Sequence, residues 1–218
     1  MEHTTPSTAK EAIAIQQEMR KKVILRDIFQ DIRTIAGIDV GYDVKANMSK
    51  CALVVMDAKS LDIKQSVIAI EESPFPYISC LLSFREAPVI LKALSVLERQ
   101  PDLLMIDGQG VAHPRRLGIA AHIGVLTGLP SIGIAKSRLC GSYKEPSSSK
   151  GSYTLLTDKD ERIGTVLRSR DNVKPLFVSA GHKISQETAL EWVIKTLGKY
   201  RLPEPTRLAD KLSKYKKN

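Results

Sequence analysis

The sequence predicts an α/β protein built on one mixed β-sheet flanked by helices. Two observations lead to this prediction. Apolar segments between residues 34 and 71 are joined by short connections, as in a three-strand antiparallel meander. From about residue 83, segments of helical period alternate with short apolar segments, which is typical of parallel strands with right-handed crossovers. No Gly/Ser-rich or Pro-rich linker divides the chain, so we expect one domain over residues 1–218.

The first part of the chain holds one expected helix and the meander. Residues 8–30 space their apolar side chains as an amphipathic helix does. The expected strands are Thr34–Tyr42, Cys51–Asp57 and Ile63–Glu71. The first two are apolar on both faces, as central strands are. Residues 74–77 then form a stiff loop, because two prolines restrict the backbone.

The rest of the chain alternates between the two periods. Helical spacing predicts helices over residues 83–99, 115–127, 186–197 and from about 205. Apolar runs predict strands at Leu103–Asp107, Pro130–Ala135, Ile163–Arg168 and Leu176–Ser179. A polar surface loop is expected at residues 141–151, and a basic tail covers residues 208–218.

Charge and cysteine content narrow the class of protein. Lys and Arg number 33 against 24 Asp and Glu, which gives a net charge of +9. This excess indicates a polyanion-binding face or a generic solvated surface, and charge alone does not choose between DNA, RNA and an anionic membrane. Three widely spaced cysteines without a CxxC motif favour a reducing compartment. No run approaches the roughly 20 apolar residues of a membrane span, so we expect a cytoplasmic protein. We also expect it to be a monomer.

Three carboxylates stand out from their surroundings. Asp39 and Asp107 lie within or at the end of apolar runs, and Glu86 lies at a helix start. A buried carboxylate must be paired, protonated or bound to a cation. Each has an ordinary alternative: Asp39 and Asp107 as caps of a turn or helix, Glu86 as an acid at a helix N-terminus. Together, on a basic chain, they predict a divalent-metal site that acts on phosphate, because Mg²⁺ prefers oxygen ligands.

Basic residues follow the same strands. His113, Arg115 and Arg116 come where a helix is expected to start, a place that favours an anion, although a solvated basic turn is the alternative. Lys136 and Arg138 follow the next strand and therefore lie on the same sheet edge as Asp107. Lys136 is thus expected to position phosphate or water.

The proline-rich loop contains aromatic residues that are candidates for insertion between bases. Phe75, Pro76, Tyr77 and Ile78 follow each other in a segment with little backbone freedom. Proteins that unstack duplexes insert such side chains between bases. Packing of the aromatic rings on the core is the alternative.

The chain resembles the endonuclease V family of deoxyinosine-directed nucleases from about residue 8 to residue 212. The resemblance rests on Ala36–Gly41, Phe75–Ile78, Ser83–Glu86, Asp107–Gly110, Ala112–Gly118, Ile132–Leu139, Ser179–His182 and Leu202–Arg207. It implies a ribonuclease-H-like fold and Mg²⁺-dependent hydrolysis, with Mn²⁺ able to substitute. The cut is expected at the second phosphodiester bond 3′ to deoxyinosine or another deaminated base, leaving 3′-OH and 5′-phosphate ends.

The resemblance also implies roles for individual residues. Asp39 and Asp107 would be metal ligands, Glu86 would complete the acidic cluster through water, and Asp210 would lie beside the metal. Lys136 and His113 would lie near the scissile phosphate, and Tyr77 would separate the strands at the lesion. The expected nucleic-acid-binding residues are Pro76, Tyr77, Ile78, Gly108, Gly110, His113, Arg115, Arg116, Lys136 and Arg138.

Some positions depart from the family pattern. Ser79 and Cys80 replace the second proline and the following glycine of the wedge, so we expect a more flexible loop with altered lesion recognition. Ala180 replaces Pro or Thr, which we expect to matter little. Three other functions stay open: cleavage of inosine-containing single-stranded RNA, an actin-like kinase using the glycines around Asp39, and nucleic-acid binding without cleavage. The kinase would need a duplicated domain, which 218 residues do not supply.

Overall fold

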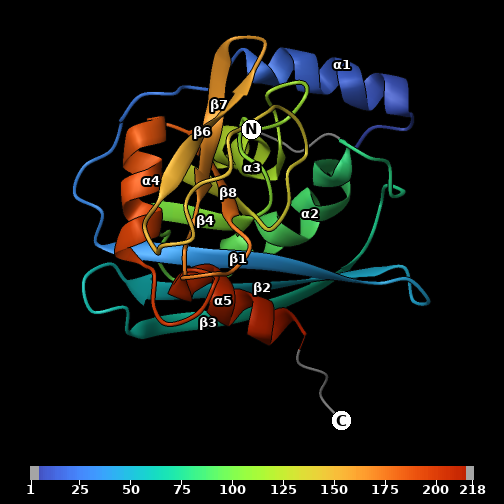
Figure 1. Ribbon diagram of the computed structural model, residues 1–218. Coiled ribbons are helices and arrows are strands. Elements are labelled where there is room, and N and C mark those ends of the chain that lie inside the picture. Colours follow the sequence, from blue (N-terminus) through green and yellow to red (C-terminus); the bar gives the residue numbers. More distant parts are fainter. Residues whose placement is uncertain (1–4, 215–218) are drawn as a thin grey trace.

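The computed structural model describes residues 5–214, which form an eight-stranded sheet of order β3-β2-β1-β4-β5-β8-β7-β6 (Figure 1). The strands are β1 (Thr34–Asp43), β2 (Met48–Asp57), β3 (Ile63–Glu72), β4 (Leu103–Asp107), β5 (Ser131–Ala135), β6 (Tyr153–Asp158), β7 (Glu161–Leu167) and β8 (Leu176–His182). The helices are α1 (Ala9–Arg20), α2 (Leu82–Ser95), α3 (Ile119–Thr127), α4 (Gln186–Lys195) and α5 (Glu204–Ser213).

The pairing of the strands confirms the predicted mixed sheet. β1, β2 and β3 form an antiparallel meander, and β1, β4 and β5 are parallel to one another. β8 then pairs antiparallel with β5, and β7 and β6 continue the sheet to its far edge. β6 was not predicted, because Leu156 is its one fully buried residue and the strand lacks an apolar run.

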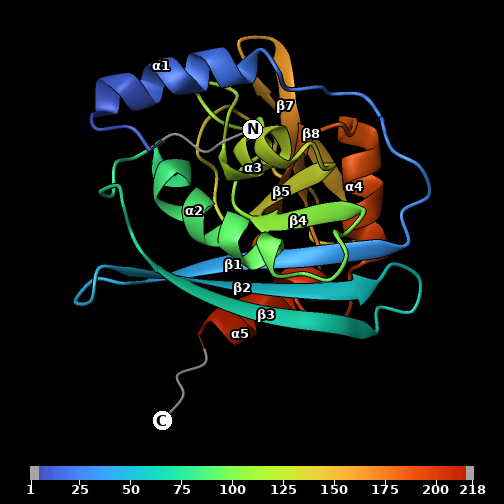
Figure 2. The same cartoon turned by 180° about the vertical axis from the view of Figure 1, so that it is seen from behind.

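Helices cover both faces of the sheet (Figures 1 and 2). Alternate residues of β4 face opposite sides, as in any strand. Leu104 and Ile106 pack in a core with residues of α2 and α3, whereas Leu103 and Met105 pack in a second core with α4. Helix α5 packs against β1 and β2 through Ala209. The continuous apolar character of β4 follows from these two cores.

Four helices are shorter than expected: α2 ends at Ser95 rather than residue 99, α4 ends at Lys195 rather than residue 197, and α1 and α3 differ for reasons seen in the structure. Helix α1 ends at Arg20, because the following segment bonds elsewhere: the Ile28 amide donates to the carbonyl of Lys183 at 3.1 Å. Helix α3 begins at Ile119 rather than at residue 115, since Arg116 adopts a left-handed φ of 57°. Of the predicted basic tail, residues 215–218 lie outside the described residues. No described helix is both long and apolar enough to cross a bilayer.

Candidate active site

The carboxyl ends of the parallel strands gather the predicted polar residues at one sheet edge. Ile38 of β1 pairs with Ile106 of β4, so the next residue of each strand, Asp39 and Asp107, lies at the same level of the sheet. Lys136 directly follows β5, the next parallel strand. Ligands of open α/β sheets bind beyond such strand ends.

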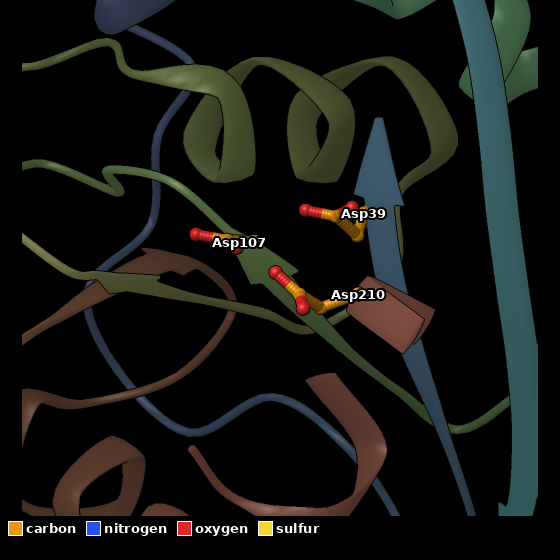
Figure 3. Close-up of side chains that lie close together, drawn as sticks. All are labelled: Asp39, Asp107 and Asp210. Atoms are coloured by element: carbon orange, nitrogen blue, oxygen red, sulfur yellow. The ribbon is translucent and has the colours of Figure 1, made fainter. Parts of the chain in front are cut away.

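Helix α5 adds a third carboxylate, Asp210. The helix can approach because β1 has a glycine there: a Cβ on Gly37 would lie 2.0 Å from the carbonyl oxygen of Pro205. Ligand atoms of Asp39, Asp107 and Asp210 all lie within 4.8 Å of one another. Figure 3 shows the three side chains converging from β1, β4 and α5. We call this group the acidic cluster.

Lys136 is the cation that faces the acidic cluster most directly. Its Nζ lies 2.5 Å from an oxygen of Asp107 and 2.7 Å from one of Asp210. Burial lowers the pKa of Lys136, but the hydrogen bonds to these two carboxylates outweigh burial and raise it. The ammonium group therefore stays charged at neutral pH.

Burial dominates the electrostatics of Asp107. Its side chain is 13% exposed, and its pKa is raised to about 6 by burial and by Asp39, against the opposing effect of Lys136. Burial also raises the pKa of Asp210, but hydrogen bonds from Lys136 and Lys214 reverse this and lower it. The site therefore holds closely spaced negative charge that the ammonium groups of Lys136 and Lys214 do not fully compensate.

Glu86 lies behind the acidic cluster on α2. It is buried, and burial raises its pKa to about 8, with Asp39 and Asp107 adding to the rise and Arg85 opposing it. The nearest Arg85–Glu86 contact is a long ion pair of 3.9 Å. Glu86 does not belong to the three-carboxylate group, but its carboxyl group feels the same charges.

The acidic cluster fits a divalent cation. Its donor atoms are all carboxylate oxygens, without histidine or cysteine, which is the set that a hard cation such as Mg²⁺ prefers over zinc. A cation would also relieve the repulsion that raises the pKa of Asp107.

A pocket of about 390 Å³ opens beside the acidic cluster, and its walls include Asp39, Glu86, Asp107, Gln109 and Tyr77. This volume lies within the usual range of small-ligand sites. Tyr77 is 69% exposed at its rim. At the inner wall Gly108 has a φ of 145°, a backbone conformation that a side chain would strain.

Of the remaining residues predicted to bind nucleic acid, some are exposed and others are bonded within the protein. Pro76 and Arg138 are exposed, Ile78 is half-buried, and Arg138 lines the pocket. Gly110 is buried and donates its N–H to the hydroxyl of Ser179 at 2.9 Å. Arg116 forms ion pairs with Asp158 and Glu161 of the β6–β7 hairpin at 2.9 and 2.7 Å.

His113 and Arg115 point inward. Arg115 donates to Gln16 and to the carbonyl of Cys80. His113 is 3% exposed, and burial, together with Arg115 and Arg116, lowers its pKa to about 4 although the Cys80 carbonyl opposes this. The imidazole is therefore neutral at physiological pH.

Sequence reasoning missed several residues of α5 and α1 that form hydrogen bonds with residues of the site. Ser213 donates a short hydrogen bond to Asp39, and Lys214 lies 2.7 Å from Asp210. The four-residue spacing of Lys214 from Asp210 could have indicated their ion pair, whereas no local pattern indicates that Ser213 reaches Asp39 on β1. The sequence gives no indication of the role of Gln16, since the helical pattern does not distinguish a buried glutamine from a surface glutamine.

The fold, with a carboxylate cluster at the ends of its parallel strands, places the chain in the ribonuclease-H-like class of α/β proteins. The Argonaute of A. aeolicus shares the fold with a TM-score of 0.55 at 16% identity, covering 87% of this chain and 29% of that one. More specifically, the Endonuclease V family model matches residues 17–211, and the chain belongs to the endonuclease V family.

Relatives match over almost their whole length. The Endonuclease V of Rippkaea orientalis is 50% identical over 213 residues, which are 98% of this chain and 93% of that protein. The Streptomyces avermitilis Endonuclease V structure has a TM-score of 0.91 at 43% identity, covering 96% and 92% of the two chains. The Ciona intestinalis Endonuclease V has a TM-score of 0.80 at 29% identity, covers 94% and 95%, and was solved with a 24mer DNA that contains an inosine followed by a ribo-adenosine.

Proposed function

We propose that this protein is a DNA repair endonuclease that recognises deoxyinosine and other deaminated bases. It hydrolyses the second phosphodiester bond 3′ to the lesion with Mg²⁺, or Mn²⁺ in its place, and leaves 3′-OH and 5′-phosphate ends. The observation that carries this proposal is the acidic cluster, with its ligand atoms within 4.8 Å, at the wall of a pocket large enough for a base. The Ciona relative bound to inosine-containing DNA supplies the substrate class.

Recognition uses the pocket and its rim. The deaminated base turns out of the stack into the pocket, at a cost of a few kcal/mol that is smaller at a mispaired base. Tyr77, flanked by Pro76 and Ile78, fills the gap in the stack. Gly108 lets the backbone come close to the base, and Arg138 at the pocket wall contacts the phosphate backbone.

Catalysis depends on the acidic cluster. Asp39, Asp107 and Asp210 would hold the metal ion. When bound, Mg²⁺ lowers the pKa of an attacking water and stabilises the leaving oxygen. Lys136 keeps its proton because of Asp107 and Asp210, so it orients the phosphate by charge and hydrogen bonding rather than as a base. Glu86 would complete the acidic cluster through water; its raised pKa of about 8 keeps its carboxyl group mostly protonated until a cation binds.

A nicking assay tests this function. A 5′-labelled duplex with one inosine is incubated with the protein and Mg²⁺, with EDTA, or with an adenine-containing control duplex, and the cut is mapped. We expect one nick at the second bond 3′ to inosine, lost in EDTA. Asp39→Asn and Asp107→Asn should abolish nicking and keep binding in Ca²⁺, whereas Asp31→Asn, at an exposed site, should behave as wild type. Full activity of both site variants would refute the assigned roles.

Inosine-containing single-stranded RNA is the second candidate substrate. The Ciona complex holds a DNA in which a ribonucleotide follows the inosine, so that family member accommodates a 2′-hydroxyl next to the lesion. Parallel assays on matched DNA and RNA strands decide between the two. A larger kcat/KM on RNA would make this protein an endoribonuclease with the same acidic cluster.

A further inference from the structure

The segment that carries Tyr77 contains one residue in an unfavourable backbone conformation. We call residues 74–81 the wedge loop. Cys80 has a φ of 65°, in the left-handed region where a side chain is disfavoured and glycine is the usual residue. A non-glycine residue stays in that region only when surrounding contacts hold it there.

Three side chains hold the backbone of Cys80. Its carbonyl oxygen accepts hydrogen bonds from Gln16 Nε2 at 3.0 Å, His113 Nε2 at 3.0 Å and a guanidinium nitrogen of Arg115 at 2.8 Å. A carbonyl oxygen has two lone pairs, so three donors on one oxygen are unusual. We call Gln16, His113 and Arg115 the carbonyl clamp.

The members of the carbonyl clamp also fix one another. Gln16 is 1% exposed, and its Oε1 accepts from Nε of Arg115 at 2.5 Å. His113 Nδ1 accepts from the backbone N–H of Arg115 at 3.1 Å. Because Nδ1 accepts, the neutral ring carries its proton on Nε2 and donates to the Cys80 carbonyl. Gln16 Nε2 also donates to the carbonyl of Leu117 at 3.3 Å, which ties the carbonyl clamp to the segment before α3.

Helix α1 supports the rest of the wedge loop. Phe75 and Leu81 are buried against Ala12 of α1, and Ile78 packs on the same cluster. Tyr77 lies between these anchors and remains exposed, with the guanidinium of Arg85 5.3 Å from its ring centre. The loop is therefore fastened on both sides of Tyr77.

We propose that the carbonyl clamp positions Tyr77 for lesion recognition, and that Gln16 is a positioning residue of this enzyme. The proposal rests on the proposed function and deepens it. It gives α1 a role in specificity, although that helix contributes no residue to the acidic cluster. It also assigns His113 and Arg115 a structural role: they hold the wedge loop at Cys80, whose backbone adopts a conformation typical of glycine.

A first experiment measures the loop without nucleic acid. In a Cys140→Ser background, Cys80 is the accessible thiol among the described cysteines, because Cys51 is buried. Gln16→Met keeps the side-chain length and removes both hydrogen-bonding groups. We expect it to speed alkylation of Cys80 by iodoacetamide about fivefold, the size expected for the one hydrogen bond that the Cys80 carbonyl loses. Mass spectrometry follows the rate.

Two further variants make this experiment decisive. Gln17→Met changes an exposed glutamine of the same helix and should leave the alkylation rate unchanged. Gln16→Glu keeps an acceptor for Arg115 but turns an oxygen toward the Cys80 carbonyl, so it should accelerate alkylation as Gln16→Met does. Wild-type rates in the Gln16 variants, with thermal unfolding showing a folded protein, would overturn the proposal.

A second experiment asks whether Gln16 acts through Tyr77. On the inosine duplex we expect Gln16→Met to raise KM about fivefold with kcat nearly unchanged, and to have no further effect in a Tyr77→Ala background, as a double-mutant cycle of coupled residues requires. An equal loss in both backgrounds would show a merely structural role and overturn the proposal. Absence of nicking by the wild type would refute the proposed function instead, and the alkylation result would still stand.

Discussion

Replacement of Asp107 by Asn should stabilise the metal-free protein while it abolishes nicking. The native pKa of Asp107 is about 6, against 3.8 for the ordinary side chain. Above pH 6 the carboxylate of Asp107 is ionised in both states, and its charge is less stable in the native state than in the unfolded chain. The free energy of unfolding is therefore lowered. A difference of about two pH units corresponds to about 3 kcal/mol, at 1.36 kcal/mol per unit. Asparagine resembles the protonated acid and removes this penalty.

The pH dependence follows from the direction of the shift. Because the native pKa is raised, the native state binds the proton more readily, and stability falls as pH rises from about 3.8 through 6. The advantage of Asp107→Asn over wild type should be about 3 kcal/mol at pH 7.5 and about half of that at pH 5. For a chain of this length the larger value raises the melting temperature by roughly 6–12 °C.

Thermal unfolding in EDTA measures this effect. Wild type, Asp107→Asn and the exposed control Asp31→Asn are compared at pH 7.5 and pH 5. Added Mg²⁺ should stabilise the wild type and change Asp107→Asn much less, because ligand binding to the native state raises its stability. If Asp107→Asn were no more stable than wild type at pH 7.5 in EDTA, the picture of an uncompensated acidic cluster would be refuted.

Three further predictions concern other parts of the molecule. The pKa of His113 is lowered to about 4, so the native state resists protonation of this ring, and the free energy of unfolding should fall by up to about 3 kcal/mol as pH drops from 6.5 to 4. In urea unfolding, the stability of His113→Gln should depend less steeply on pH than that of the wild type, and an equal pH dependence would contradict this. Gly37→Ala should lower the free energy of unfolding by about 1–3 kcal/mol and remove most nicking activity, since its Cβ would lie 2.0 Å from the Pro205 carbonyl oxygen. Gly41→Ala, whose Cβ would lie 3.7 Å from its nearest neighbour, is the control in the same unfolding assay. Tyr77→Ala should reduce discrimination of inosine from adenine about tenfold and leave kcat nearly unchanged; unchanged discrimination in competition kinetics would remove Tyr77 from lesion recognition.

Local sequence patterns were enough to predict most of the helices and strands and the sheet edge at which the site lies. Apolar runs and helical spacing are local properties of the chain, so the meander and the parallel strands β1, β4 and β5 could be read from them. Since the carboxyl ends of parallel strands share one edge, the strand pattern placed Asp107 and Lys136 together, and the apolar flanks of Asp39 indicated that it faces a site. β6 was missed because it has no apolar run and buries only Leu156, whereas β3 at the opposite edge contains the apolar run 67–70.

The tertiary structure alone decided which distant groups meet. By geometry Asp210 joins the acidic cluster because α5 packs onto β1 at Gly37, 173 residues earlier, and no local pattern encodes that contact. Gln16 reaches the Cys80 carbonyl across 64 residues for the same kind of reason. Arg116 turns toward the β6–β7 hairpin, where a sequence pattern suggested an anion site. Periodicity reports backbone conformation and burial, whereas these contacts depend on how the elements pack.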